Sequence, residues 1–436
     1  MSIEHSMRSA AREIFLDALA EASIEKAFDR HVSYQRGVLR VCDDLYDLDA
    51  HPRVLCVSFG KAAHHMAEIL ASQAGTAMEG VVVDPNPHSY QLPGYRYFAG
   101  GHPQPNEESV RAAEAILKSL NALNPQALVI FLISGGGSAA VEKPADSEIA
   151  LADLISTYKA LVNSGAPIAQ INAVRKHLSA VKGGRMAQAA QGAQQVSILI
   201  SDVPENALDS LSSGPTMPDS SSVDDCYRIV REHNLLPEFP ASVRELFERR
   251  ALEETPKKDD PAFARSRWWK LLSNETAEKA AAAAASRHGF AVEIDHSCDD
   301  WDYARAADYL LDRLRSLRRG VSKACIVSGG EVTVKVPANA GVGGRNQHFA
   351  LNCAQKIAGE NIAVLSAGTD GIDGNSPAAG AVADGTTLER AKKAGLDMAA
   401  YFNGFNSFPL FEKLGDAIQT GPTGNNVRDL RVLMAW

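Results

Sequence analysis

Glycine-rich segments follow apolar, strand-like runs at six places in this chain of 436 residues. Glycine lets backbone N–H groups approach an anion closely, and a helix that begins there adds partial positive charge. In open α/β sheets, ligands bind beyond the carboxyl ends of the strands. The pattern therefore predicts a site for a phosphorylated or otherwise anionic small molecule. The six segments are residues 58–61, 134–138, 201–204, 328–331, 368–371 and 420–424.

The second of these segments places three successive glycines between two serines, directly after the apolar run 128–133. Its N–H groups can converge on one anion, and the hydroxyls can add donors. The alternative is a tight strand-to-helix turn. A dinucleotide fingerprint is incomplete, because the region after Ala140 has a helical pattern and supplies no second strand ending in an acid. We predict phosphate contacts from Gly60, Ser134, Gly135, Gly136, Gly137 and Ser138.

Two cations stand beside glycines at predicted strand or helix ends. Lys61 can place an ammonium on a phosphate, and Arg345 can grip a carboxylate or phosphoryl group through two parallel hydrogen bonds. No Walker A pattern occurs in the chain. The alternatives are a solvated lysine and a surface arginine near a helix start. Asn346 is a plausible N-cap for a helix that continues to Ile357.

Carboxylates occur at two further strand ends. Asp202 follows the apolar run 196–200, and Asp370 and Asp373 lie in a glycine-rich loop. Such carboxylates can bind Mg²⁺ or accept a proton from a substrate hydroxyl. For Asp373, a turn-forming role is the alternative.

Residues 171–190 form a cationic segment. We expect Arg175, Lys182 and Arg185 to share one helical face, as either a solvated stripe or the wall of an anion pocket. His177 is interpreted as structural rather than as a catalytic base.

The elements that position these residues alternate between strand and helix from about residue 53 to residue 225. This alternation predicts an α/β fold with a mostly parallel, doubly wound sheet. Residues 331–337 look like a hairpin strand, which predicts a mixed sheet in the second half. The first forty residues are expected to be helical and to pack outside the first sheet. We predict an N-terminal domain over residues 1–235, a junction over 236–267 and a smaller α/β domain over 268–436.

The overall composition limits the classes of partner. A net charge of −9 argues against nucleic acid or an anionic membrane surface as the main partner. The six cysteines lack metal-type spacing, the N-terminus lacks the unbroken apolar centre of a secretory signal, and no apolar run is long enough for a membrane span. We therefore expect a cytoplasmic protein, a monomer or homodimer, that acts on a small molecule.

The ordered motifs resemble those of one family, the class II D-glycerate 2-kinases. The C-terminal half of these proteins is the MOFRL module, and some members carry the name hydroxypyruvate reductase. The matches cover most of the chain. They are residues 59–63, 101–105, 134–139, 172–179, 182–185, 201–204, 213–216, 329–334, 343–347, 368–374 and 420–424.

The resemblance implies a two-domain α/β protein with its active site in the cleft between the domains. It also implies phosphorylation of D-glycerate at the 2-hydroxyl with ATP and Mg²⁺. Lys61 and Arg345 then match the paired cations that face the substrate and the transferring phosphoryl group. Asp202 is assigned as the proton acceptor, and Asp370, with Asp373, as a metal or nucleotide contact. Further nucleotide or phosphate contacts are expected at Arg175, Glu331, Gly343, Gly344 and Asn346.

The chain departs from the family pattern at Asn106, where Asp is usual, and at Glu205 and Asn206, where a glycine turn is usual. It also departs at Asn425 and Arg428, which replace the commoner Thr and Asn. These departures concern substrate detail more than the class of reaction. Two other functions stay open. One is hydroxypyruvate reduction with NAD(P)H, for which a complete dinucleotide fingerprint is missing. The other is a non-catalytic sensor of a small phosphorylated acid.

Overall fold

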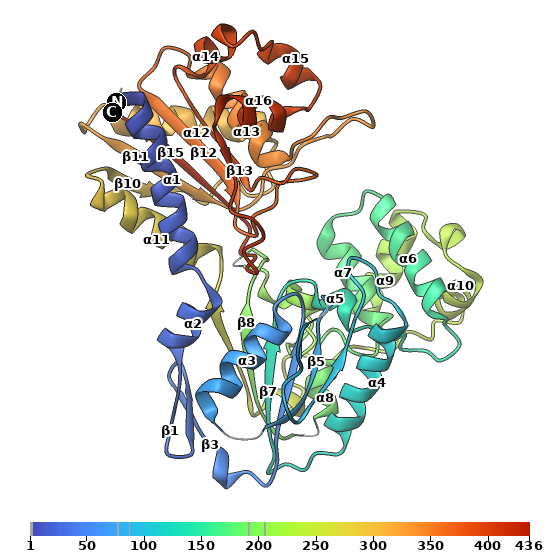
Figure 1. Ribbon diagram of the computed structural model, residues 1–436. Coiled ribbons are helices and arrows are strands. Elements are labelled where there is room, and N and C mark those ends of the chain that lie inside the picture. Colours follow the sequence, from blue (N-terminus) through green and yellow to red (C-terminus); the bar gives the residue numbers. More distant parts are fainter. Residues whose placement is uncertain (1–2, 76–77, 87, 191, 205) are drawn as a thin grey trace. The chain divides into compact units, whose positions relative to one another are not determined.

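The computed structural model describes residues 3–75, 78–86, 88–190, 192–204 and 206–436 (Figure 1). The chain divides into two compact units. The central unit comprises Ala27–Leu271, and the terminal unit comprises Met1–Lys26 and Leu272–Trp436. Each unit contains a six-stranded sheet with helices, so the predicted α/β class is confirmed. The units are described separately.

These limits differ from the domain limits expected from the sequence. Residues 236–267 lie within the central unit, and the first helix, α1 (Ile3–Glu21), lies within the terminal unit. Ala11, Ile14 and Phe15 of α1 are fully buried in a core with strands of the C-terminal half. The expectation that the N-terminal helix covers the first sheet is therefore wrong. An apolar helix face shows that a helix is packed, but not against which sheet.

The sheet of the central unit has the order β6-β5-β4-β7-β8-β9. The four pairings from β6 to β8 are parallel, which confirms the expected parallel arrangement. The carboxyl ends of β4, β7 and β8 consequently lie along one edge, next to one another. The strands are β4 (Val54–Phe59), β5 (Glu79–Val83), β6 (Tyr95–Phe98), β7 (Leu128–Ile133), β8 (Gln194–Ile200) and β9 (Ser266–Leu272).

Helices cover both faces of this sheet because alternate strand residues point in opposite directions. Leu55, Val57 and Phe59 of β4 pack in one core with α4 (Glu107–Asn121). Ser58, which lies between them in sequence, donates a hydrogen bond of 2.7 Å to the Ala63 carbonyl at the start of α3 (Ala63–Ala74). The α8 helix (Arg185–Ala189) contributes Met186 to the α4 side.

A second core in the central unit is purely helical. It is formed by α6 (Leu151–Asn163), α7 (Ile168–His177), α9 (Val223–Glu232) and α10 (Ala241–Glu248). Figure 1 shows these helices gathered beside the sheet rather than over it. The short elements of this unit are α5 (Gly137–Ala140), η1 (Leu48–Ala50), η2 (Leu208–Ser213), η3 (Leu236–Glu238) and η4 (Pro261–Phe263). A separate three-stranded sheet follows α2 (Ile24–His31) and comprises β1 (Val32–Gln35), β2 (Val38–Val41) and β3 (Asp44–Asp47).

The sheet of the terminal unit has the order β10-β11-β15-β12-β13-β14 and is mixed, as expected. The pair β10–β11 is parallel, and the other pairs are antiparallel. The strands are β10 (Ala291–Ile294), β11 (Ala324–Gly329), β12 (Ile362–Gly368), β13 (Gly380–Asp384), β14 (Ala417–Ile418) and β15 (Asp429–Ala435).

The source of the antiparallel pairing differs from the expected one. Residues 331–337 form no strand, and only an isolated bridge joins Thr333 to Asp302. The neighbour of β11 is instead β15, whose residues are all buried. An apolar strand buried on both faces stabilises the centre of a sheet better than a segment such as 331–337, whose Val336 is 64% exposed.

Helices also cover both faces of the terminal sheet. Cys325 and Val327 of β11 pack with α1 and α11 (Asn274–Arg287), whereas Ala324 and Ile326 pack with α12 (Tyr303–Arg318) and α13 (Arg345–Lys356). The remaining helices are α14 (Thr387–Lys393), α15 (Met398–Asn403) and α16 (Ser407–Leu414). In the described ranges, no helix is both long and apolar enough to cross a bilayer.

Candidate active site

The glycine loop after β7 brings side chains from three strand ends together in the central unit. Gly136 has a φ of +82°, a conformation that favours glycine. A Cβ on Gly136 would lie 2.9 Å from the His102 ring and 3.1 Å from Cγ of Lys61. A Cβ on Gly135 would overlap the Asp202 carboxylate. The glycines are therefore required for the close approach of Lys61, His102 and Asp202.

This convergence follows from the parallel sheet. Lys61 follows β4, the glycine loop follows β7 and Asp202 follows β8, and these three strands are neighbours in register. The Lys61 backbone N–H also donates to the Gly135 carbonyl at 2.9 Å. Sequence analysis chose these residues separately, and the sheet places them side by side.

The two serines of the loop have different surroundings. The buried Ser134 hydroxyl accepts a hydrogen bond from the Ala62 N–H at 3.1 Å, so it braces the turn. Gly60, with a φ of +116°, packs against Ser134 so closely that a Cβ would overlap it. Ser138 is half-buried and its hydroxyl lies 2.9 Å from that of Ser213. Of the two, Ser138 is the one that lines an open cavity.

His102 is a site residue that the sequence analysis did not single out. Partial burial lowers its pKa, and the charge of Lys61 lowers it further. Both effects favour the neutral imidazole, in which one ring nitrogen donates a hydrogen bond and the other accepts one. The available signal was its place in the 101–105 segment, one of the motifs that resemble the family.

The cationic segment does not form one helical face, so that expectation is wrong. The α7 helix ends at His177 and α8 begins at Arg185, which leaves Lys182 in the connecting loop. Two glycines in the left-handed region, Gly183 and Gly184, turn the chain there. The side chains of Arg175, Lys182 and Arg185 thus enter different surroundings.

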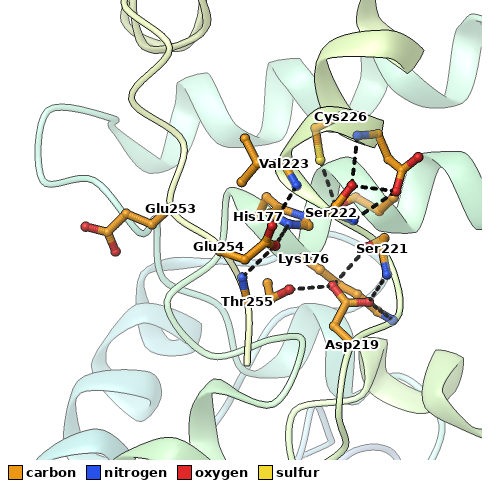
Figure 2. Close-up of polar contacts among 12 residues, drawn as sticks. Lys176, His177, Asp219, Ser221, Ser222, Val223, Cys226, Glu253, Glu254 and Thr255 are labelled. Carbon is orange, nitrogen blue, oxygen red and sulfur yellow. Dashed lines mark hydrogen bonds and ion pairs between the residues drawn. The ribbon is translucent and has the colours of Figure 1, made fainter. Parts of the chain in front are cut away.

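Two side chains of this segment, Lys176 and His177, are held in the polar network of Figure 2. Lys176 Nζ lies 3.1 Å from Asp219 and 3.2 Å from Asp209. His177 is bound between the Ala173 carbonyl at 2.8 Å and Glu254 at 2.9 Å. Both side chains therefore join α7 to the segments after it, consistent with the structural interpretation of His177.

In the terminal unit, Arg345 is the first residue of α13 and is held by two carboxylates. It donates to the two Asp429 oxygens at 2.6 and 3.1 Å, and it lies 2.8 Å from Glu331. Burial lowers the pKa of Arg345, but these ion pairs outweigh burial and raise it overall. Burial and the Asp429 charge raise the pKa of Glu331, whereas Arg345 opposes them. The guanidinium is thereby fixed in orientation.

The expected N-cap is wrong: Gly344, not Asn346, precedes the helix. The side chain that serves the first turn is Asp373, whose carboxylate accepts from the N–H groups of Asn346 at 3.1 Å and Gln347 at 2.9 Å. It also accepts from the side-chain amides of these two residues. A Cβ on Gly344 would overlap Asp373, which explains the glycine. Burial raises the pKa of Asp373 to about 6 despite these bonds.

We therefore interpret Asp373 as a cap of α13 rather than as a metal ligand. Asp370 differs, because it is half-buried and lines a cavity of about 740 Å³ with Glu331 and Asp429. The glycines of segment 341–344 form another side of this cavity, and Val332, Val334, Val336 and Phe405 add apolar surface. This terminal-unit cavity is large enough for a nucleotide.

The fit of this cavity to Mg²⁺ depends on its donors. The described part of the chain has no group of three or more His, Cys, Asp or Glu placed to hold a metal. However, Mg²⁺ usually binds one or two carboxylates and takes its other ligands from water and substrate phosphates. Asp370 and Glu331 meet that requirement, so the residues fit a metal that arrives with a nucleotide.

Two of the departures from the family pattern have structural explanations, and Glu205 lies outside the described residues. Asn106 is the N-cap of α4, where its side chain accepts from the Ser109 N–H at 2.9 Å. Arg428 forms two bonds with Asp299, at 2.7 and 2.6 Å. Both residues therefore support loops beside the sites.

Parallel strand ends and a glycine loop approached by a lysine are typical of α/β proteins that bind phosphorylated small molecules. Two family models match the chain: "Domain of unknown function (DUF4147)" over residues 10–248 and "MOFRL family" over residues 324–429. D-glycerate 2-kinase of Thermotoga maritima is 36% identical, over 87% of this chain and 89% of its own length. Glycerate 2-kinase of Pyrococcus horikoshii is 34% identical, over 96% of each chain.

A solved structure gives the same result. The crystal structure of glycerate kinase from Thermotoga maritima matches with a TM-score of 0.86 and 32% identity, over 99% of this chain and 100% of that one. The chain therefore belongs to the glycerate 2-kinase family.

Proposed function

We propose that this enzyme transfers the terminal phosphoryl group of ATP to the 2-hydroxyl of D-glycerate. The relatives named above are glycerate kinases, and a kinase requires a nucleotide substrate. The main structural support for phosphoryl transfer is that Lys61 and Asp202 both approach one glycine loop. A cation and a carboxylate at one phosphate-binding turn suit the transfer of a phosphoryl group to an alcohol.

In this reaction, the 2-hydroxyl oxygen forms a bond to the γ-phosphorus while the bond to the ADP oxygen breaks. Asp202 accepts the hydroxyl proton. Lys61 stabilises the negative charge on the transferring group, and the glycine N–H groups orient it. Arg345, fixed by Asp429 and Glu331, neutralises charge on the nucleotide phosphates.

The terminal-unit cavity is our candidate for the nucleotide. Gly343, Gly344 and Asn346 lie at its phosphate end, at the start of α13. Mg²⁺ bound by Asp370 and Glu331 would supply charge neutralisation between the phosphates. The apolar side of the cavity offers surface for a base.

We place the enzyme in the cytoplasm. All six cysteines are free thiols, and five of them are buried, which suits a reducing compartment.

The test is an assay of ADP release with ATP, Mg²⁺ and D-glycerate, with the product identified by phosphorus NMR. The proposal expects a 2-phosphoglycerate signal. A parallel assay follows NADH consumption with hydroxypyruvate. NADH consumption without ADP release would contradict the proposal and favour a reductase. Tight binding of a phosphorylated acid without turnover would favour a sensor.

A further inference from the structure

A cavity of about 370 Å³ lies in the central unit, between the glycine loop, α6, α7 and the loop after His102. Its described lining residues include two cations, Lys159 and Arg175, and no Asp or Glu. Pro103, Pro105, Ile155 and Val162 provide apolar surface. A water-filled pocket with only positive formal charge attracts anions.

Arg175 lies in the last turn of α7 and is half-buried. Its Nε is buried without a hydrogen-bond partner. Among the described residues, the other basic side chains of the segment 171–190 each contact an acid: Lys176 contacts Asp209 and Asp219, His177 contacts Glu254, Lys182 contacts Glu142 and Arg185 contacts Glu253. No such pair is formed by the Arg175 guanidinium within the described part of the chain.

Glu142, the acid that could pair with Arg175, already has hydrogen-bond and ion-pair partners. It is fully buried and accepts from the Ser179 hydroxyl at 2.5 Å, from the Tyr158 hydroxyl at 2.9 Å and from the Lys182 ammonium. Lys182 therefore balances the charge of Glu142. Arg175 rests on the Tyr158 ring, with its guanidinium carbon 4.8 Å from the ring centroid.

One positive charge thus remains without a counter-charge beside the cavity. Holding an unpaired charge away from water is unfavourable unless a ligand supplies the opposite charge. Tyr158 fixes the plane of the guanidinium, and Glu142 fixes Tyr158. The arrangement is that of a preorganised anion contact rather than of a folding element.

We propose that this cavity binds the oxyanion of a small substrate, a carboxylate or a phosphate, through Arg175, with Tyr158 and Glu142 as positioning residues. The two candidate ligand groups are the glycerate carboxylate and a nucleotide phosphate. Their choice rests on the proposed function, whereas anion binding by the cavity does not. The cavity is also lined by His102 and Gly136, and Lys61 packs over Gly136. A short acid held at Arg175 therefore extends toward the glycine loop that Lys61 and Asp202 approach.

The test is direct binding by calorimetry, without turnover, of D-glycerate, neutral glycerol and ADP. The proteins are the wild type, Arg175→Met, and Arg111→Met as a control for the loss of an arginine. Arg111 lies in α4, its side chain is 70% exposed, and it does not line the cavity. We expect Arg175→Met to weaken one anion by about 10- to 100-fold, the range for losing charged hydrogen bonds. We expect Arg111→Met to bind as the wild type does.

The ligand that Arg175→Met binds more weakly identifies the oxyanion that Arg175 contacts. A loss confined to D-glycerate assigns the carboxylate, and a loss confined to ADP assigns the phosphate. Unchanged affinity for both in Arg175→Met overturns the proposal, as does a wild type that binds neither. Failure of the kinase assay alone overturns the proposed function but not this site, because binding is measured separately.

A second measurement separates binding from a structural role. Without ligand, Arg175→Met removes an unpaired charge and keeps the Lys182–Glu142 pair, so its melting temperature should equal or exceed that of the wild type. A fall of several degrees would mean that Arg175 stabilises the fold and would overturn the proposal. Tyr158→Phe should weaken the same anion as Arg175→Met, though less, because the ring remains while its bond to Glu142 is lost.

Discussion

The terminal-unit cavity and the central-unit cavity described above have opposite charge. The terminal-unit cavity is lined by five acids and two arginines, whereas the central-unit cavity is lined by two cations and, in its described lining, no acid. In the first, Glu331 and Asp429 hold Arg345 in place, Asp299 outside the lining holds Arg428, and the lining keeps an excess of acids. In the second, Arg175 has no acidic partner of its own. An acidic cavity accepts phosphates only together with a cation, while a cationic cavity accepts an anion directly.

The difference shows two ways to prepare a cation for a phosphorylated substrate. Carboxylates orient Arg345 and compensate its positive charge. An aromatic ring orients Arg175 but does not compensate its positive charge. Lys61, which is exposed, depends on the glycine loop for its position. Substitutions at these residues should therefore have different effects on rate, metal dependence and stability.

The largest expected effect is on turnover. Lys61→Ala and Arg345→Ala should each slow the reaction by about a hundredfold or more, the range for removing one preorganised charge donor. Steady-state ADP release at saturating substrates measures this. Lys143→Ala, which removes a lysine paired with Glu114 outside both cavities, is the control. Near-normal rates in both variants would remove Lys61 and Arg345 from the site.

The next effect concerns the acidic cavity. Asp370→Asn should raise the Mg²⁺ concentration needed for half-maximal rate by roughly tenfold, because the amide lacks the charge that attracts the ion. The KM for D-glycerate should stay the same. A change in the glycerate KM with no change in Mg²⁺ dependence would mean that Asp370 contacts the acceptor instead.

The free energy of unfolding should respond differently to the loss of Lys61 and of Arg345, the two cations proposed to act in catalysis. Arg345→Ala leaves Glu331 beside the buried Asp429 without their shared cation, so we expect a loss of about 1–3 kcal/mol in the free energy of unfolding. Lys61→Ala breaks no ion pair with a described residue and should leave stability within about 0.5 kcal/mol. Urea unfolding measures both. Equal losses in the two variants would contradict the difference between the sites.

The smallest effect depends on pH. His348 in α13 is 2% exposed, lies between the rings of Phe402 and Phe405, and burial lowers its pKa to about 4. The unfolded chain, with a histidine pKa of about 6.5, binds a proton between these values that the folded chain does not. Stability therefore falls as pH is lowered from about 6.5 toward 4.

His348→Phe should reduce this loss by about 1–2 kcal/mol between pH 7 and pH 5, as measured by urea unfolding at both values. Asp373 contributes the opposite slope, because its pKa is raised to about 6, but it is present in both proteins. An equally large loss in His348→Phe would show that another group controls the acid sensitivity.

The glycine-rich strand ends were predictable because they are local features. The sequence predicted site roles for Lys61, Asp202 and Arg345 from their neighbours in the chain, and these roles stay predictions. It did not identify His102 as a site residue, because its contact with Gly136 joins two loops that are far apart in sequence. Nor could it separate Arg175 from Lys182, since both are cations of one segment and only packing decides that Glu142 pairs with Lys182.

The sequence by itself determined the α/β class, the parallel sheet of the central unit and the glycine-rich turns at the strand ends. These features follow from the periodicity of apolar residues and from the backbone freedom of glycine, and both can be seen in short stretches of sequence. Only the tertiary structure decided that α1 packs in the terminal unit, that β15 rather than residues 331–337 pairs with β11, and that Asp373 caps α13. Each of these is a choice among compatible partners, and the chain makes it by burying the most apolar surface and satisfying the most polar groups at once.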